Sequence, residues 1–223
     1  NIRDFVVLEK AADLGGTWRD NQYPGAACDV QSHMYSLSFA PKTDWSKRYA
    51  EADEIFGYMQ DLAARYQFKE FCRFEHEVIC AKYDEDGCYW HIDIKDQAPL
   101  QAQFLIFASG PLHVPQIPHI KGIETFKGKV FHSSQWDHSY DLSNKHVASI
   151  GTGGSAIQYI PEIAPQVKQL YVMQRTAAWV IPRDERRYSK LDQTLFKHSE
   201  AYRKLHRTRL YWSNESRVVP IVK

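Results

Sequence analysis

A glycine-rich loop between a predicted strand and a predicted helix is the feature that most limits how this chain can fold. Residues 151–156 read GTGGSA, which matches the pattern GxGxxA. The loop follows an apolar strand pattern over 146–150 and precedes a helix pattern over 155–164, and a further strand pattern lies at 170–173. Strand, helix and strand in this order predict an α/β architecture.

The small residues of this loop suit a pyrophosphate. The first glycine turns the chain tightly, the second lets the backbone approach the phosphates, and Ala156 allows the helix to pack against the strand. Amides at the helix N-terminus then face the negative charge. The second strand pattern leads into Arg175, which suits the 2′-phosphate of NADPH better than the free ribose of NADH. An ordinary glycine-rich turn is the alternative interpretation.

Several other segments are predicted to form strands. The apolar run 5–8 closed by Glu9 predicts a buried parallel strand. Strands are predicted over 74–83 and 88–94 around a turn at 84–87, and over 104–108. The best linker candidate is the proline-rich segment 111–118.

Two further helices are predicted from apolar spacing. Ile55, Met59, Leu62 and Tyr66 fall on one helical face. A later face carries five apolar residues: Leu191, Leu195, Tyr202, Leu205 and Trp212. Pro161 should kink or shorten the helix that follows the glycine loop.

Composition excludes several classes of protein. The 28 Lys and Arg residues nearly balance the 27 Asp and Glu residues, whereas a nucleic-acid-binding protein would usually show a basic excess. No apolar run is long enough for a membrane span, and no secretion signal opens the chain. The four cysteines form no CxxC pair and have no histidine at zinc spacing, so no metal site is expected. These features predict a soluble, cytoplasmic protein.

Glu9 closes a strand at a place where dinucleotide-binding units carry an acid on the ribose of a ligand such as FAD. The companion glycine loop would lie about 20 residues upstream, but only eight residues precede Glu9. Taken alone, Glu9 is a solvated acid at a strand end. The abrupt ends of the sequence suggest a fragment that does not bind FAD tightly or turn over by itself.

A second motif is more specific. The segment 126–137 reads FKGKVFHSSQWD and resembles the FxGxxxHxxxW(P/D) fingerprint of Baeyer–Villiger monooxygenases, which are flavin-containing monooxygenases of class B. The matching residues are Phe126, Gly128, His132, Trp136 and Asp137. Three shorter segments resemble the same family: 15–18 (GGTW), 23–29 (YPGAACD) and 174–176 (QRT).

The resemblance implies two dinucleotide-binding, Rossmann-like three-layer units, one for FAD and one for NADPH, both incomplete here. It places a partial FAD-binding domain at 1–114, a linker with the fingerprint at 115–145, and a partial NADPH-binding domain with a helical segment at 146–223. The family's fingerprint lies at the junction of the two domains. We therefore expect His132 and Trp136 to couple the domains, and His132 not to be the chemical base.

The resemblance also assigns residues to cofactors by position. Toward FAD it places Glu9, Thr17, Trp18, Asp29, Tyr35 and Val78, with Asp29 beside the isoalloxazine as the catalytic candidate. Toward NADPH it places Thr152, Gly153, Gly154, Ser155, Ala156, Ile157, Gln158, Arg175 and Thr176. Ordinary structural roles are the alternatives, because Trp18 and Tyr35 could be core aromatics, Val78 a strand residue and Asp29 a turn cap.

The activity implied is insertion of one oxygen atom of O2 into a ketone to give an ester or lactone, with FAD and NADPH as cofactors. There are two alternatives to this activity. One is an enzyme that oxidises nitrogen or sulfur, and the other is an inactive truncated nucleotide-binding fragment. A flavin disulfide reductase is disfavoured because the redox cysteine pair is missing. The sequence leaves the ketone, the regiochemistry and the oligomeric state open.

Overall fold

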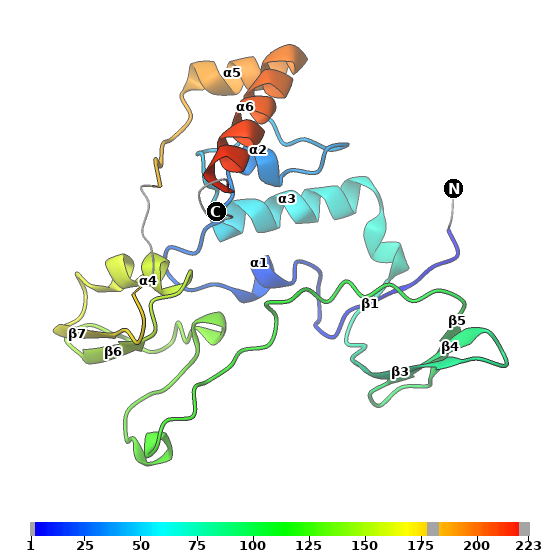
Figure 1. The fold of residues 1–223 in the computed structure, drawn as a ribbon, viewed down its shortest axis with the longest axis horizontal. Coiled ribbons are helices and arrows are strands. Elements are labelled where there is room, and N and C mark those ends of the chain that lie inside the picture. The colour runs from blue at the N-terminus through cyan, green and yellow to red at the C-terminus, as the bar shows by residue number, and fades with distance from the viewer. Residues whose placement is uncertain (1–2, 178–182, 219–223) are drawn as a thin grey trace. The chain divides into compact units, whose positions relative to one another are not determined.

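The structure is a computed structural model that describes residues 3–177 and 183–218 (Figure 1). The chain forms two compact units, each built from two stretches of sequence. Unit 1 comprises Asn1–Asp20 and Met59–Phe126, and unit 2 comprises Asn21–Tyr58 and Lys127–Lys223. The chain contains both helices and strands, including two parallel strands joined by a helix, which confirms the α/β class. Within the described ranges, no helix has the length and apolar character needed to cross a membrane.

Unit 1 contains two small sheets. Strand β1 (Val7–Leu8) pairs in parallel with β2 (Cys72–Arg73). Phe5 stacks on Phe71 with ring centroids 4.5 Å apart. The parallel strand predicted over 5–8 is therefore confirmed in part, but the prediction that it is buried is wrong. Phe5 and Val6 are exposed and lie outside the paired residues.

The second sheet is antiparallel, in the order β3 (Val78–Asp84), β4 (Tyr89–Ile94) and β5 (Leu100–Ala102). The predicted hairpin is confirmed, with Asp84 paired to Tyr89 across the turn. The Asp84 carboxylate accepts hydrogen bonds from the amides of Asp86 and Gly87, both at 3.0 Å. This local bond favours a turn at these residues.

The strand predicted over 104–108 is wrong. No strand forms there, and Phe104 is 84% exposed. A strand requires a neighbour whose backbone groups accept and donate hydrogen bonds. No other segment of the described ranges pairs with these residues, so the apolar run alone does not make a strand.

Helix α3 (Ala52–Arg65) confirms the helix predicted around Ile55. The buried face carries Ala52, Ile55, Tyr58 and Ala63. Tyr66 lies beyond the helix and is exposed. The spacing therefore identified the helix, whereas one of the four residues used to define its face is not on it.

Unit 2 contains the predicted strand–helix–strand unit. Strand β6 (His146–Ile150) pairs in parallel with β7 (Gln169–Met173), and α4 (Ala156–Ile163) connects them. Each element lies within a residue or two of its predicted range. Pro161 lies inside α4, which continues past it and ends at Ile163.

The single helical face predicted over 191–212 is wrong. Two helices form instead, α5 (Lys190–His198) and α6 (Glu200–Val218), and Ser199 between them is extended. The Ser199 hydroxyl accepts a hydrogen bond from the amide of Tyr202 at 3.2 Å, which caps α6 and interrupts the helix. Leu191 is 69% exposed, whereas Phe196 and Leu210 are buried.

Short helical turns complete the fold. They are α1 (Thr17–Asp20), α2 (Ser32–Tyr35), and the 3₁₀ turns η1 (Phe68–Phe71), η2 (Ile123–Thr125) and η3 (Ser133–Gln135).

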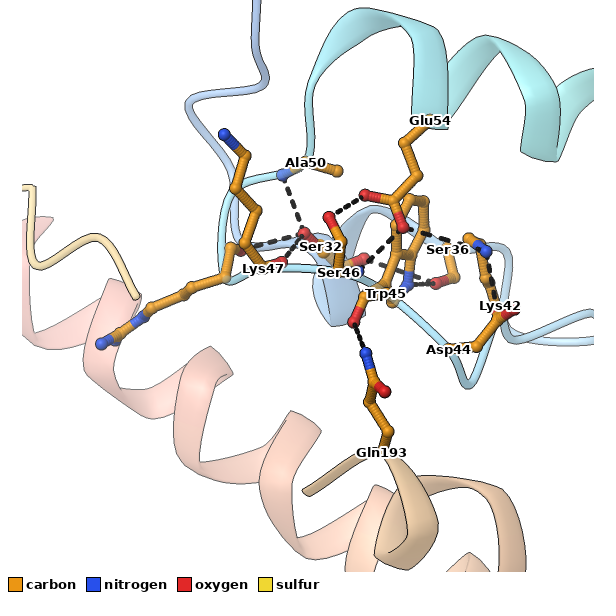
Figure 2. A network of polar contacts seen from close by, with 11 residues as sticks. Ser32, Ser36, Lys42, Asp44, Trp45, Ser46, Lys47, Ala50, Glu54 and Gln193 are labelled. Carbon is orange, nitrogen blue, oxygen red and sulfur yellow. Dashed lines mark hydrogen bonds and ion pairs between the residues drawn. The ribbon is translucent and has the colours of Figure 1, made fainter. Parts of the chain in front are cut away.

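A polar network surrounds the fully buried Trp45 in unit 2 (Figure 2). The Trp45 indole nitrogen donates to the Ser36 hydroxyl at 3.1 Å, and the Trp45 carbonyl accepts from Gln193 of α5 at 3.4 Å. Ser32 of α2 donates to the carbonyl of Lys47 and accepts from the amide of Ala50. The network therefore fixes the 45–50 segment against α2.

Helices α2, α5 and α6 share an aromatic cluster, which consists of His33, Tyr188, Phe196, Tyr202 and His206. Phe196 is at the centre, with its ring 4.0 Å from His33, 5.2 Å from Tyr188 and 5.0 Å from His206. Burial, followed by His206, Arg207 and Arg203, lowers the pKa of His33 to about 3. Burial also raises the pKa of Tyr188 to about 12. Both shifts favour the uncharged forms of His33 and Tyr188 at neutral pH.

Candidate nucleotide-binding site

The glycine loop turns where β6 ends. Gly151 has a φ of +100°, a conformation that favours glycine. Its amide donates to the carbonyl of Met173 at 2.9 Å, which extends the β6–β7 pairing by one residue. The first glycine of the motif therefore has the conformation that its predicted role requires.

The next residues leave room beside the backbone. A Cβ added at Gly153 or Gly154 would meet no atom within 4 Å. The amides of Gly153, Gly154 and Ser155 donate to no acceptor in the described ranges. Free amides at the start of a helix are the groups that bind phosphate, so this loop fits the pyrophosphate of a dinucleotide.

The end of β7 lies against the same loop. The Gln174 amide nitrogen donates to the Thr152 hydroxyl at 3.0 Å. Arg175 and Thr176 follow and are exposed. The guanidinium of Arg175 can therefore reach a ligand that leaves the loop along this strand end.

Helix α4 also contacts the 23–28 segment. The side-chain amide of Gln158 donates to the carbonyl of Ala27 at 2.9 Å and accepts from the Ala27 amide at 3.2 Å. The same Gln158 oxygen accepts from the Tyr23 hydroxyl at 2.9 Å. Gln158, expected from the sequence to touch the nucleotide, thus uses its side chain within the protein.

The fingerprint also contacts α4. The Trp136 ring lies 5.3 Å from that of Tyr159 and 5.2 Å from that of Phe131, and Tyr159 meets the ring of Tyr23 edge-on at 6.2 Å. A row of aromatic rings therefore runs from the fingerprint across α4 to the 23–28 segment.

The other fingerprint residues have local roles. The imidazole of His132 accepts a hydrogen bond from the amide of Ser134 at 3.2 Å and caps η3. The Lys129 ammonium, 2.6 Å from Asp137, lowers the pKa of that carboxyl to about 2, with help from Ser139. Phe126 is exposed, and Gly128 lies in the loop before η3. His132 thus orders the fingerprint loop.

The flavin-side candidates fall in both units. Asp29 and Tyr35 belong to unit 2, where Asp29 is exposed and Tyr35 ends α2. The guanidinium of Arg183 donates to the carbonyl of Cys28 at 2.9 Å, next to Asp29. A positive group therefore lies close to the segment that carries the catalytic candidate.

Unit 1 carries Glu9, Thr17, Trp18 and Val78. A Glu9 carboxylate oxygen accepts from the amide of Ala11 at 2.9 Å and lies 3.7 Å from Arg19. Thr17 and Trp18 begin α1, and Val78 is an exposed residue at the start of β3.

Sequence reasoning missed the anchoring of the 23–28 segment. A Cβ at Gly25 would lie 2.9 Å from the Gln158 carbonyl oxygen and 2.8 Å from Glu162, and Gly25 has a φ of +75°. The Pro-Gly pair at 24–25 was a signal for a tight turn, but the sequence does not show which helix the turn meets.

Replacing Gly25 with alanine should therefore lower the free energy of unfolding by about 1 to 3 kcal/mol, because the side chain would clash in a strained conformation. Gly153→Ala is the matched control, since its added carbon meets open space. Urea denaturation of both variants checks this. Equal stability of the two would show that Gly25 does not pack against α4.

Comparison with known proteins places these features in context. A model of the flavin-binding monooxygenase-like family matches residues 3–210. A Baeyer–Villiger monooxygenase of Streptomyces coelicolor is 45% identical over 222 residues, covering 100% of this chain and 43% of that protein. Another, of Pseudomonas aeruginosa, is 42% identical over 216 residues, covering 97% of this chain and 41% of that protein. The chain thus spans about two fifths of these relatives.

Solved structures are similar as well. The oxidized steroid monooxygenase bound to NADP has a TM-score of 0.78 and 36% identity, over 86% of this chain and 38% of that one. The OTEMO complex with FAD and NADP (form 3) has a TM-score of 0.79 and 33% identity, over 86% of this chain and 39% of that one.

Proposed function

Because the chain belongs to the flavin-binding monooxygenase-like family, we propose that it supplies the NADPH loop and part of the FAD site of a Baeyer–Villiger-type oxygenase. The expected family and the expected flavoprotein class are confirmed. NADPH dependence and a ketone substrate are the finer parts of the proposal. They are supported by Arg175 and by the Trp136-Asp137 ending of the fingerprint.

The open backbone at Gly153 and Gly154 is the observation that carries the proposal. Space beside both residues, and amides without acceptors in the described ranges, together suit a pyrophosphate. Thr152 to Gln158 would surround this group through the backbone, and Arg175 and Thr176 would contact the 2′-phosphate.

On the flavin side, Glu9 would bind the ribose of FAD, and Thr17 and Trp18 would lie along the cofactor. Asp29 and Tyr35 would approach the isoalloxazine, and Val78 would meet the adenine through its backbone. The same proposal includes the division of the chain into domains. These are an FAD-binding domain over 1–114, a linker over 115–145 and an NADPH-binding domain over 146–223.

Bound FAD, once reduced by NADPH, would supply the oxygen-transfer chemistry with O2 as the oxidant. The residues of this chain would bind and orient the two cofactors. Asp29 would hold a negative charge beside the flavin, where it can pair with a cation. The organic substrate would be a ketone and the product an ester or lactone.

Because the chain spans only about two fifths of its relatives, the proposal is tested with a full-length oxygenase that contains it, loaded with flavin and supplied with NADPH and O2. We expect a yellow protein that consumes NADPH with a cyclic ketone and releases a lactone, which gas chromatography detects. Product only from an amine or a sulfide would favour a nitrogen- or sulfur-oxidising enzyme. A colourless protein that takes up neither cofactor would contradict the proposal.

Arg175→Ala should weaken NADPH binding by about 10- to 150-fold, because a charge-assisted phosphate contact contributes about 1.5–3 kcal/mol. NADH binding should change little, since NADH has no 2′-phosphate. Titration with both nucleotides measures the two affinities. An equal loss for both would remove Arg175 from the 2′-phosphate site.

A further inference from the structure

Gln158 holds both backbone groups of one residue in a distant segment. Its amide pairs with the N–H and the C=O of Ala27, and it also accepts from the Tyr23 hydroxyl. In the described ranges, no other group bonds to the Ala27 N–H or C=O. The side chain thus makes the two hydrogen bonds to the Ala27 backbone that a neighbouring strand could otherwise make.

The backbone fixes the same contact from the other side. Gly25 lies so close to the carbonyl of Gln158 that a Cβ would not fit. The amide of Cys28 donates to Ala50, and the amide of Ala52 donates to Ala26, both within 2.9 Å. The 23–28 segment is therefore held between α4 and the 50–52 segment, which leaves little freedom for the position of Asp29.

Helix α4 has the glycine loop at its N-terminus. Gln158 follows Ser155 within one helical turn, and its own backbone amide donates to the Ser155 carbonyl at 3.0 Å. One rigid turn of helix thus joins the loop proposed for the pyrophosphate to the segment that leads to Asp29. Both ends of this connection lie in unit 2.

We propose that Gln158 is a positioning residue, whose amide sets the place of Asp29 relative to the nucleotide bound at the glycine loop. The inference rests on the proposed function. Hydride transfer from NADPH to the flavin depends on the geometry of the reacting groups, and a misplacement of about 1 Å can cost about 100-fold in rate. Gln158 therefore controls the rate of flavin reduction rather than the affinity for NADPH.

Anaerobic stopped-flow reduction of the flavin-loaded holoenzyme by NADPH tests the proposal. In Gln158→Ala, we expect the limiting rate of flavin reduction to fall about 10- to 100-fold, with the Kd for NADPH and the FAD content unchanged. Tyr23→Phe removes only the hydroxyl bond to Gln158 and should give a smaller loss of the same kind. The two losses should not add, because the residues act through one contact.

Gln166→Ala is the matched control. Gln166 is an exposed glutamine just after α4, and its side-chain amide donates to the nearby carbonyl of Glu162 at 3.0 Å. It should keep the wild-type reduction rate. If Gln158→Ala does not retain FAD, Tyr23→Phe alone decides, since a phenylalanine preserves the buried ring.

Three results would overturn the proposal. A wild-type limiting rate in a folded Gln158→Ala or in Tyr23→Phe would show that the contact does not position the flavin-side segment. A raised Kd for NADPH at an unchanged limiting rate would show that Gln158 binds the nucleotide directly. Failure of NADPH to reduce the wild-type flavin would contradict the proposed function itself, whereas normal wild-type reduction with unaffected variants contradicts only the role of Gln158.

Discussion

Replacing Phe196 with alanine should lower the free energy of unfolding by about 3 to 5 kcal/mol. Phe196 is 0% exposed and contacts His33 of α2 as well as Tyr188, Tyr202 and His206. Truncation would leave a cavity where α2, α5 and α6 meet, and the rings around it cannot all move to fill the space. Urea denaturation followed by circular dichroism measures the loss.

Leu191→Ala in the same helix provides the control. Leu191 is exposed, so its truncation should cost less than about 1 kcal/mol. The two variants also distinguish the observed core, which contains Phe196, from the apolar face predicted from the sequence. That predicted face includes Leu191 and omits Phe196. A larger loss for Leu191 than for Phe196 would show that the predicted face is the packed one.

Lowering the pH should destabilise the aromatic cluster strongly. His33 is 3% exposed, and its pKa falls from 6.5 to about 3 in the folded protein. Between these values the unfolded chain binds a proton that the folded chain does not, so stability decreases as the pH falls. The free energy of unfolding should drop by about 1.4 kcal/mol per pH unit below about pH 6.5, and by about 3 to 5 kcal/mol in total.

The surroundings of His33 act in the same direction. Burial lowers the pKa of His206 as well, and the guanidinium groups of Arg203 and Arg207 further disfavour a charge on His33. His33→Leu should therefore flatten the pH dependence between pH 6.5 and 4, as measured by urea denaturation across a pH series. His119→Leu, at an exposed histidine, is the control. An unchanged slope in His33→Leu would assign the acid sensitivity to other groups.

Local patterns were sufficient for the β6–α4–β7 unit. Its strands and helix have clear periods, and the glycines between them occupy the turn that the predicted role requires. The β3–β4 hairpin was also predictable, because Asp84 bonds to its own turn. In both cases the information lies within a few neighbouring residues.

Features that depend on distant partners could not be predicted. The apolar run 104–108 has the composition of a strand, but strand formation depends on a neighbour that the run itself does not specify. The break at Ser199 involves no glycine or proline, and a serine within an apolar helical pattern is easily taken as a surface residue. Contacts of Gln158 with Tyr23 and Ala27 span 135 and 131 residues, a separation at which local spacing carries no information.

Unit 2 is assembled from two stretches of chain with part of unit 1 between them, and this order has a consequence for folding during synthesis. The bond from Gln193 to the Trp45 carbonyl joins residues 148 positions apart. At roughly 5 to 20 residues per second, the ribosome needs about 7 to 30 s to make the intervening chain. During that interval the Trp45 carbonyl lacks its donor from α5 and the ring of His33 lacks Phe196, so apolar surface that is buried in the finished protein stays in contact with water. Chaperone binding to the nascent chain should accordingly be strongest while residues 21–58 await the helices made last.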